Sequence, residues 1–117
     1  MERTDVIRRM VLDEICDDYE NVDQVILRNV AKDCAKLGIA IERSDIVNAL
    51  ASLIEDGLAK AYLLSCMASA KEFDGMPPID AVQENFETYF YITDKGMDLH
   101  QSDGLWWPFD EEGEPRI

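Results

Sequence analysis

The stretch from Glu42 to Leu64 reads ERSDIVNALASLIEDGLAKAYLL and predicts a helix, a turn and a strand in immediate succession. Its apolar residues recur at spacings of three and four, which places them on one face of a helix. These residues are Ile46, Val47, Leu50, Leu53 and Ile54. Gly57 follows the last apolar turn, where a residue with a left-handed backbone can end a helix. From Ala59 to Leu64 the composition is apolar and aromatic, so a strand is expected there.

Two further helices are predicted before this stretch. Residues 4–18 form the first, with an apolar face of Val6, Ile7, Met10, Val11 and Ile15. The second is expected to begin near Val22, because Asn21 and Gln24 have the spacing of a capping box. Gly38 ends it by the same logic as Gly57. Its apolar stripe consists of Val22, Val25, Ile26, Val30, Cys34 and Leu37.

The second half of the chain predicts one more strand and one short helix. The aromatic run from Tyr89 to Ile92 is the expected pairing partner of the first strand. Residues 66–87 between them contain the pair Pro77 and Pro78 and are expected to form a long loop. Thr93 is expected to cap a helix over residues 94–101, with Met97 and Leu99 turned inward.

This order, with the patterns DIVNALASLIEDGLAKAYLL and YFYITDKGMDL, resembles the winged-helix domain of bacterial transcriptional regulators. The residues that carry the resemblance are Leu50, Leu53, Gly57 and Leu58, then Tyr91, Ile92, Thr93, Lys95 and Gly96. The resemblance covers about residues 5–102. It implies an α+β fold with a three-helix core, a two- or three-stranded β-wing and a short C-terminal helix. We therefore expect a winged-helix domain over residues 1–102, followed by an aromatic and acidic tail over residues 103–117.

The charge of the chain weighs against general nucleic-acid binding. The 117 residues include 25 acidic and 11 basic side chains, for a net charge of -14. Affinity for nucleic acid comes mainly from Lys and Arg that displace counterions from phosphates. The loop over residues 66–87 adds to the acidic excess, since it has five acids against one lysine: Glu72, Asp74, Asp80, Glu84 and Glu87 against Lys71.

The resemblance nevertheless implies a DNA-facing surface, because the third helix of such a domain lies in the major groove. It would present Arg43, Ser44, Asn48 and Ser52 there. The second helix adds a stripe of cations at intervals of four, which can contact backbone phosphates: Arg28, Lys32 and Lys36. The alternative is that these cations face water, or face the acids of the first helix, which are Asp13, Glu14, Asp17 and Asp18.

Catalytic and metal-binding motifs are missing from the sequence. His100 is the single histidine, and the sequence places no cysteine pair at metal-ligand spacing near it. Cys16, Cys34 and Cys66 lie far apart within apolar patterns, which is typical of reduced, buried thiols. No phosphate-binding glycine loop or nucleophile elbow occurs. We therefore expect a non-enzymatic protein with no cofactor and no metal.

The tail offers large apolar side chains that a small domain rarely leaves in water, namely Leu105, Trp106, Trp107 and Phe109. They are expected either to fold back into the groove beside the first helix or to act as a dimer latch or a docking peptide for another protein.

Two functional hypotheses remain open. One is a transcriptional-regulator-like protein, acting as a homodimer that contacts DNA. The other is an acidic protein-interaction module that binds a basic partner or mimics nucleic acid. No apolar run reaches membrane-spanning length, and the N-terminal MERTDVIRRM has charges where a signal peptide needs an apolar core. A cytoplasmic protein without a membrane contact is expected.

Overall fold

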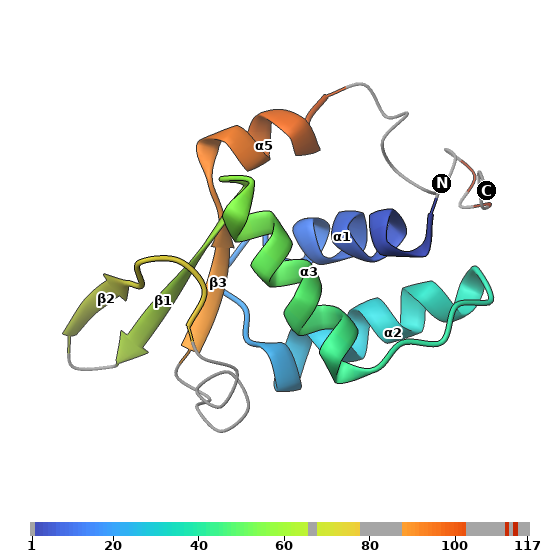
Figure 1. Ribbon diagram of the computed structural model, residues 1–117, viewed down its shortest axis with the longest axis horizontal. Helices are drawn as coiled ribbons and strands as arrows, with labels where there is room; N and C mark the ends of the chain where they lie inside the picture. The colour runs from blue at the N-terminus through green and yellow to red at the C-terminus, as the bar shows by residue number, and fades with distance from the viewer. Residues whose placement is uncertain (1, 66–67, 78–87, 103–111, 113, 115–117) are drawn as a thin grey trace.

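The computed structural model describes residues 2–65, 68–77, 88–102, 112 and 114, and it shows an α+β fold (Figure 1). Helices α1, α2 and α3 pack together, and a three-stranded antiparallel sheet with the strand order β2-β1-β3 lies at one end. The elements are α1 (Arg3–Glu14), η1 (Val22–Ile26), α2 (Leu27–Lys36), α3 (Arg43–Glu55), β1 (Ala59–Ser65), β2 (Ala68–Glu72), β3 (Thr88–Ile92) and α5 (Asp94–His100). The predicted fold class is therefore confirmed at the level of α+β.

The hydrophobic core lies where the apolar stripes of the helices meet the sheet. All five predicted core residues of α1 are buried, and so are Ile46, Val47, Leu50 and Leu53 of α3. Ile54 is half-buried and packs at the edge of the core. Phe90 of β3 is fully buried and is the largest such side chain in the described part of the chain. The helical periodicity in the sequence thus identified the core correctly.

The predicted starts of the second and last helices are confirmed at their caps, although the second begins as the π-helix η1 and continues as α2. The Asn21 side chain accepts a hydrogen bond from the Gln24 backbone N–H at 2.8 Å, and the Thr93 hydroxyl accepts one from Gly96 N–H at 3.0 Å. The Gln24 side-chain oxygen accepts a hydrogen bond from the Asn21 side-chain amide at 3.1 Å. In a capping box it would accept from the Asn21 backbone N–H instead. Gly38 and Gly57 have φ values of 72° and 77°, a conformation that glycine adopts without a Cβ penalty.

The first helix is shorter than predicted, since α1 ends at Glu14 and not at residue 18. Contacts with β3 explain the early end. The Ile15 carbonyl accepts a hydrogen bond from the Ile92 N–H at 3.2 Å. Glu20 and Phe90 then exchange backbone hydrogen bonds of 3.1 and 2.8 Å. The chain after α1 is therefore drawn against the sheet, and these non-local bonds leave no sequence pattern.

The predicted strand pairing is confirmed, with β1 antiparallel to β3 from Ala59 opposite Ile92 to Leu63 opposite Thr88. The prediction of a loop over residues 66–87 is wrong for Ala68–Glu72, which forms β2 along the other edge of β1. The segment ASAKE has small and charged residues in place of a β-branched or aromatic run, so propensity did not reveal it. Backbone pairing to β1, and an ion pair of 2.9 Å between Lys60 and Glu72, hold it there.

Helix α5 turns inward only one of the two side chains expected to do so. Met97 is half-buried and packs against the core, as predicted, but Leu99 is 41% exposed. Residues two apart on a helix point in nearly opposite directions, so a helix of seven residues cannot bury both. None of the helices among the described residues is long and apolar enough to cross a membrane.

Candidate functional site

Helix α3 presents a mixed polar face to solvent. Ser44 and Asn48 are exposed, and Ser52 and Arg43 are half-buried. The helix begins with Asp45 accepting a hydrogen bond from the Glu42 backbone N–H at 2.8 Å. The acidic residue in this first turn is favourable, because the N-terminal end of a helix carries partial positive charge. It also places a carboxylate where a DNA-reading helix would approach phosphates.

Arg43 is held by a carboxylate of the same chain. Its Nε donates to Asp23 Oδ1 at 2.6 Å, and its Nη2 donates to Asp23 Oδ2 at 3.1 Å. This fork geometry connects the start of α3 to η1, and such bidentate pairs are the stronger kind of ion pair. The principal cation predicted for the DNA-facing side of α3 is therefore engaged within the protein.

Two arginines of α1 neutralise acids at the two ends of α3. Arg3 donates to both carboxylate oxygens of Asp45, at 3.0 and 2.8 Å, and also to the Ala40 carbonyl. Arg8 donates to Asp56 at 2.7 Å. The hydrogen bonds from Arg3 and from the Glu42 N–H lower the pKa of the Asp45 carboxyl. Sequence reasoning missed both pairs, because the partners are more than 40 residues apart.

The cationic stripe of α2 exists as predicted. Arg28, Lys32 and Lys36 are all exposed. Lys36 lies 3.9 Å from Asp33, whereas Arg28 and Lys32 make no ion pair within the described residues. The predicted alternative of pairing with acids of α1 is not observed there. The Glu14 carboxylate of α1 instead accepts a hydrogen bond from the Asn29 side-chain amide of α2, at 2.9 Å.

The predicted DNA-contact residues fall into two groups. Asn48 and Ser52 line a hollow of mixed polarity between α1 and α3, together with Asp5, Arg8 and Asp45. Arg28 instead borders a shallow surface hollow beside η1, together with Asp23, Gln24 and Leu27. Asp23, the partner of Arg43, therefore also lies beside Arg28. One carboxylate therefore lies near a cation of α2 and is paired with the cation at the start of α3.

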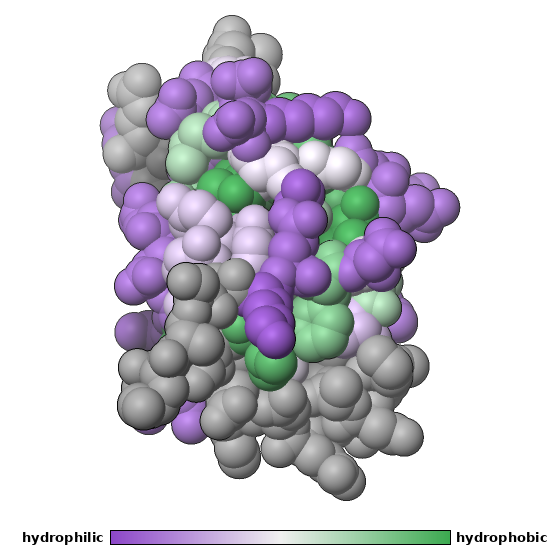
Figure 2. Space-filling model, turned by 90° about the vertical axis from the view of Figure 1, so that its left-hand side faces the viewer, coloured by the Kyte–Doolittle hydropathy of each residue, from purple (hydrophilic) through white to green (hydrophobic). Residues whose placement is uncertain are grey.

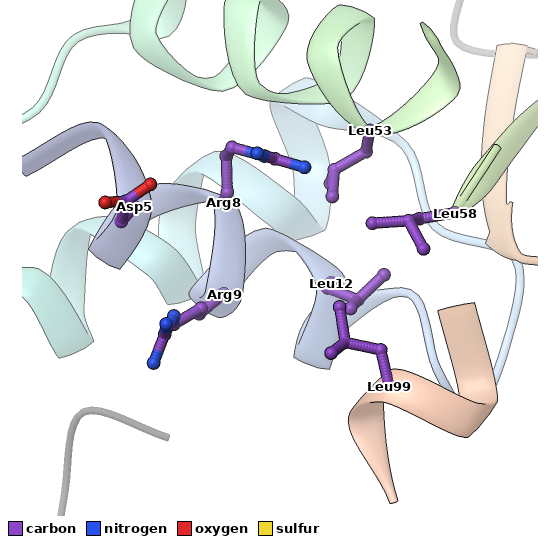
Figure 3. Close-up of a pocket in the computed structure, with 7 residues that line it drawn as sticks. All are labelled: Asp5, Arg8, Arg9, Leu12, Leu53, Leu58 and Leu99. Atoms are coloured by element: carbon purple, nitrogen blue, oxygen red, sulfur yellow. The ribbon is translucent and has the colours of Figure 1, made fainter. Parts of the chain in front are cut away.

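A small apolar pocket lies between α1, α3 and α5. Figure 3 shows its leucines directed toward one another from different elements, with Arg8 and Arg9 on α1 beside them. The apolar wall consists of Leu12, Leu53, Leu58 and Leu99. Its volume of about 140 Å³ is below the range of roughly 300–1,000 Å³ that is usual for small-molecule sites. The pocket does not indicate a site for a drug-sized ligand.

The sheet end of the molecule is predominantly polar. Figure 2 shows hydrophilic side chains that surround and interrupt small hydrophobic patches on this side. Lys60 is paired with Glu72, and Lys71 and Asp74 are exposed. Beside the sheet, the rings of Tyr19 and Tyr91 stack at 4.7 Å between centroids. The three other acids predicted for the loop, Asp80, Glu84 and Glu87, lie outside the described residues.

The fold brings three potential metal ligands together, although the sequence predicted none. Asp13 Oδ1 lies 2.9 Å from His100 Nε2, and the Cys16 thiol lies next to both. Burial, followed by the nearby carboxylates of Asp13 and Asp17, raises the pKa of the Cys16 thiol to about 11. The spacing of Asp13 and Cys16 fits one helical turn, but nothing in the sequence indicates that His100 joins them.

The remaining predictions concern the other two cysteines and the aromatic tail. Cys34 is a buried free thiol, as expected, whereas Cys66 lies outside the described residues. The four apolar side chains of the tail, Leu105, Trp106, Trp107 and Phe109, also lie outside them. Neither docking beside α1 nor a dimer latch is tested by the structure.

Comparison with known proteins gives no relative for this chain. No family model matches it, and neither a curated protein nor a solved structure does.

Proposed function

We propose that this chain is a non-enzymatic winged-helix domain that binds a basic protein partner through its acidic surface. The order of three helices, a small antiparallel sheet and a short helix supports the winged-helix assignment. The charge of -14 supports a positively charged partner. In this proposal the protein acts in the cytoplasm, and its fold resembles that of transcriptional regulators while its contacts are made with protein.

The observation that carries the proposal is the bidentate pair between Arg43 and Asp23. A DNA-reading α3 needs cations that are available to phosphates. Arg43 is engaged by Asp23, and there is no Lys or Arg between Ser44 and Ala59. The acids at the two ends of α3, Asp45 and Asp56, are paired with Arg3 and Arg8 of α1, so these arginines are also engaged within the protein.

A non-enzymatic role is supported by the chemistry of Cys16 and His100. A cysteine nucleophile works as a thiolate and has a lowered pKa. The Cys16 thiol is 7% exposed and has a pKa raised to about 11, which is the opposite condition. The contact between His100 and Asp13 therefore does not supply an activated cysteine.

The test is fluorescence anisotropy with two labelled probes, a mixed-sequence DNA duplex and a lysine-rich peptide. Each is titrated with the full chain at low salt and near physiological salt. We expect the peptide to bind with an affinity that falls as salt increases, and the duplex to remain unbound even at low salt. Binding of the duplex with a steep salt dependence, and none of the peptide, would contradict the proposal.

Contact with DNA through α2 is the second candidate, favoured by the exposed Arg28 and Lys32. If α2 contacts phosphates, Lys32→Glu weakens duplex binding uniformly across sequences and flattens its salt dependence. Lys71→Glu is the matched control, because it places the same charge change on the exposed side of β2. Equal effects of the two variants would remove α2 as the binding surface.

The homodimer belongs to the same proposal and depends on the tail. Deletion of residues 103–117 is expected to abolish self-association or partner capture, because it removes both tryptophans. Sedimentation velocity of the full chain and of the truncated chain measures this directly. An unchanged association state after truncation would exclude the tail as the interface.

A further inference from the structure

Asp13, Cys16 and His100 converge where the end of α1 meets the end of α5. Asp13 is in the last turn of α1, Cys16 follows that helix, and His100 is the last residue of α5. The carboxylate oxygen, the thiol sulfur and the imidazole nitrogen all lie within 4.8 Å of one another. Asp13 Oδ1 and His100 Nε2 are separated by 2.9 Å. Three different ligand chemistries are therefore directed at one small volume.

We propose that these three side chains form a binding site for a divalent transition metal ion of the zinc class. Zinc binds sulfur at about 2.3 Å, imidazole nitrogen at about 2.0–2.1 Å and carboxylate oxygen at about 2.0–2.2 Å. Neighbouring ligand atoms of a tetrahedral site are consequently roughly 3.3–3.7 Å apart. Because the three ligand atoms already lie within 4.8 Å of one another, side-chain movements of about 1 Å bring them to these separations.

The ligand set selects the class of metal. A thiolate and an imidazole favour zinc, cobalt and nickel, whereas magnesium and calcium prefer oxygen ligands only. Binding replaces the proton of the Cys16 thiol with the metal ion, because a cysteine ligates a metal as the thiolate. Asp17 and Asp18 are exposed and follow directly in sequence, so their charge adds to the local attraction for a cation.

Within the described part of the chain, the surroundings leave a route for the ion and a fourth coordination position. The Asp13 side chain is 39% exposed and that of His100 is 23% exposed, so both can be reached from solvent. Cys16 is buried beneath them, and its sulfur currently donates to the Asp13 carbonyl at 2.9 Å. Three protein ligands leave a fourth tetrahedral position for water.

A bound ion would join segments that are far apart in the sequence. Asp13 and His100 are 87 residues apart, and α5 covers only a small part of α1. A metal ligated from both helices therefore constrains the C-terminal helix against the N-terminal one. Because the assembled site exists only in the folded chain, binding stabilises the fold.

Cobalt titration of the reduced full chain tests the site, because thiolate ligation to Co²⁺ gives a charge-transfer absorption band. We expect one equivalent of Co²⁺ to develop this band and Zn²⁺ to abolish it by displacement. Cys16→Ser is expected to lose the band. His100→Gln is expected to weaken Zn²⁺ binding by at least the ~10–100-fold that follows loss of a second-shell partner.

The two other cysteines provide matched controls. Cys34→Ser and Cys66→Ser are expected to keep both the band and the wild-type affinity, and circular dichroism establishes that each variant is folded. The melting temperature adds a readout without cobalt, since Zn²⁺ is expected to raise it in the wild type and not in His100→Gln. Retention of the band in Cys16→Ser, its loss in Cys66→Ser, or no cobalt binding by the wild type would each overturn the proposal.

Discussion

Arg43 and Asp23 form a bidentate ion pair, with Nε to Oδ1 at 2.6 Å and Nη2 to Oδ2 at 3.1 Å. The two side chains are 24% and 30% exposed, so solvent screens the pair less than it screens a fully exposed one. The pair fixes the first residue of α3 to η1. The positive charge of Arg43, which a contact between α3 and DNA would require, is therefore neutralised by Asp23.

Asp23→Asn is therefore expected to give detectable binding of duplex DNA at low salt, where the wild type is expected to show none. The change removes the ionised partner of Arg43, a carboxylate that also lies beside Arg28. Fluorescence anisotropy against the wild type measures the gain. Asp98→Asn is the matched control, because it alters net charge equally at an exposed position of α5. If both variants gain the same affinity, total charge and not the loss of the Asp23 carboxylate is responsible.

The sequence predicted those features that depend on neighbours along the chain. The apolar stripe of α3, the Asn21 and Thr93 caps, and the turns at Gly38 and Gly57 all arise from local periodicity and backbone conformation. Each was located correctly because its physical cause lies within a few residues.

Apart from the pairing of β1 with β3, features created by contact between distant segments were not predicted. β2 is a strand because it pairs with the free edge of β1. α1 ends early because the Ile15 carbonyl accepts a hydrogen bond from Ile92 of β3. The same limit applies to the candidate site. Periodicity placed the α2 cations on one exposed row, but it gave no sign of Arg43 pairing with Asp23, or of His100 approaching Asp13.

Gly96→Ala is expected to destabilise the fold, although alanine is favoured over glycine in a helix by about 1 kcal/mol. Gly96 is buried in α5, and a Cβ there would collide with the Leu58 carbonyl and lie 2.7 Å from Ile92 Cγ1. Relief of this overpacking costs about 1–3 kcal/mol. Urea denaturation measures the loss. Asp98→Ala, at an exposed position of the same helix, is expected to change stability by less than about 0.5 kcal/mol.

That pair of variants separates packing from helix propensity. A Gly96→Ala protein as stable as the wild type would show that α5 moves away from Leu58 without cost.

Asp45→Asn is expected to lower stability at pH 7, and the loss is expected to diminish in acid. The hydrogen bonds from Arg3 and the Glu42 N–H depress the folded-state pKa of Asp45. The wild-type carboxylate therefore stabilises the fold above its unfolded pKa of about 3.9, and this contribution is lost as the pH falls through the lower folded value. Urea denaturation at pH 7 and near pH 3 gives the comparison. A loss that is independent of pH would exclude the ionised carboxylate as its source.

Glu14→Gln is expected to have the opposite effect and to stabilise the fold at pH 7. Burial raises the pKa of Glu14, while the hydrogen bond from Asn29 opposes the shift in part. The folded wild type is therefore penalised once Glu14 ionises, whereas glutamine stays neutral and its side-chain oxygen can still accept from Asn29. The stability contributed by the protonated form is fully present below the unfolded pKa of about 4.3 and is lost as the pH rises through the higher folded value.

The advantage of glutamine should accordingly appear at pH 7 and vanish near pH 3 in urea denaturation. Glu55→Gln, an equal charge change at an exposed position of α3, serves as the control. An equal gain in both variants would indicate relief of general charge repulsion and not of burial at Glu14.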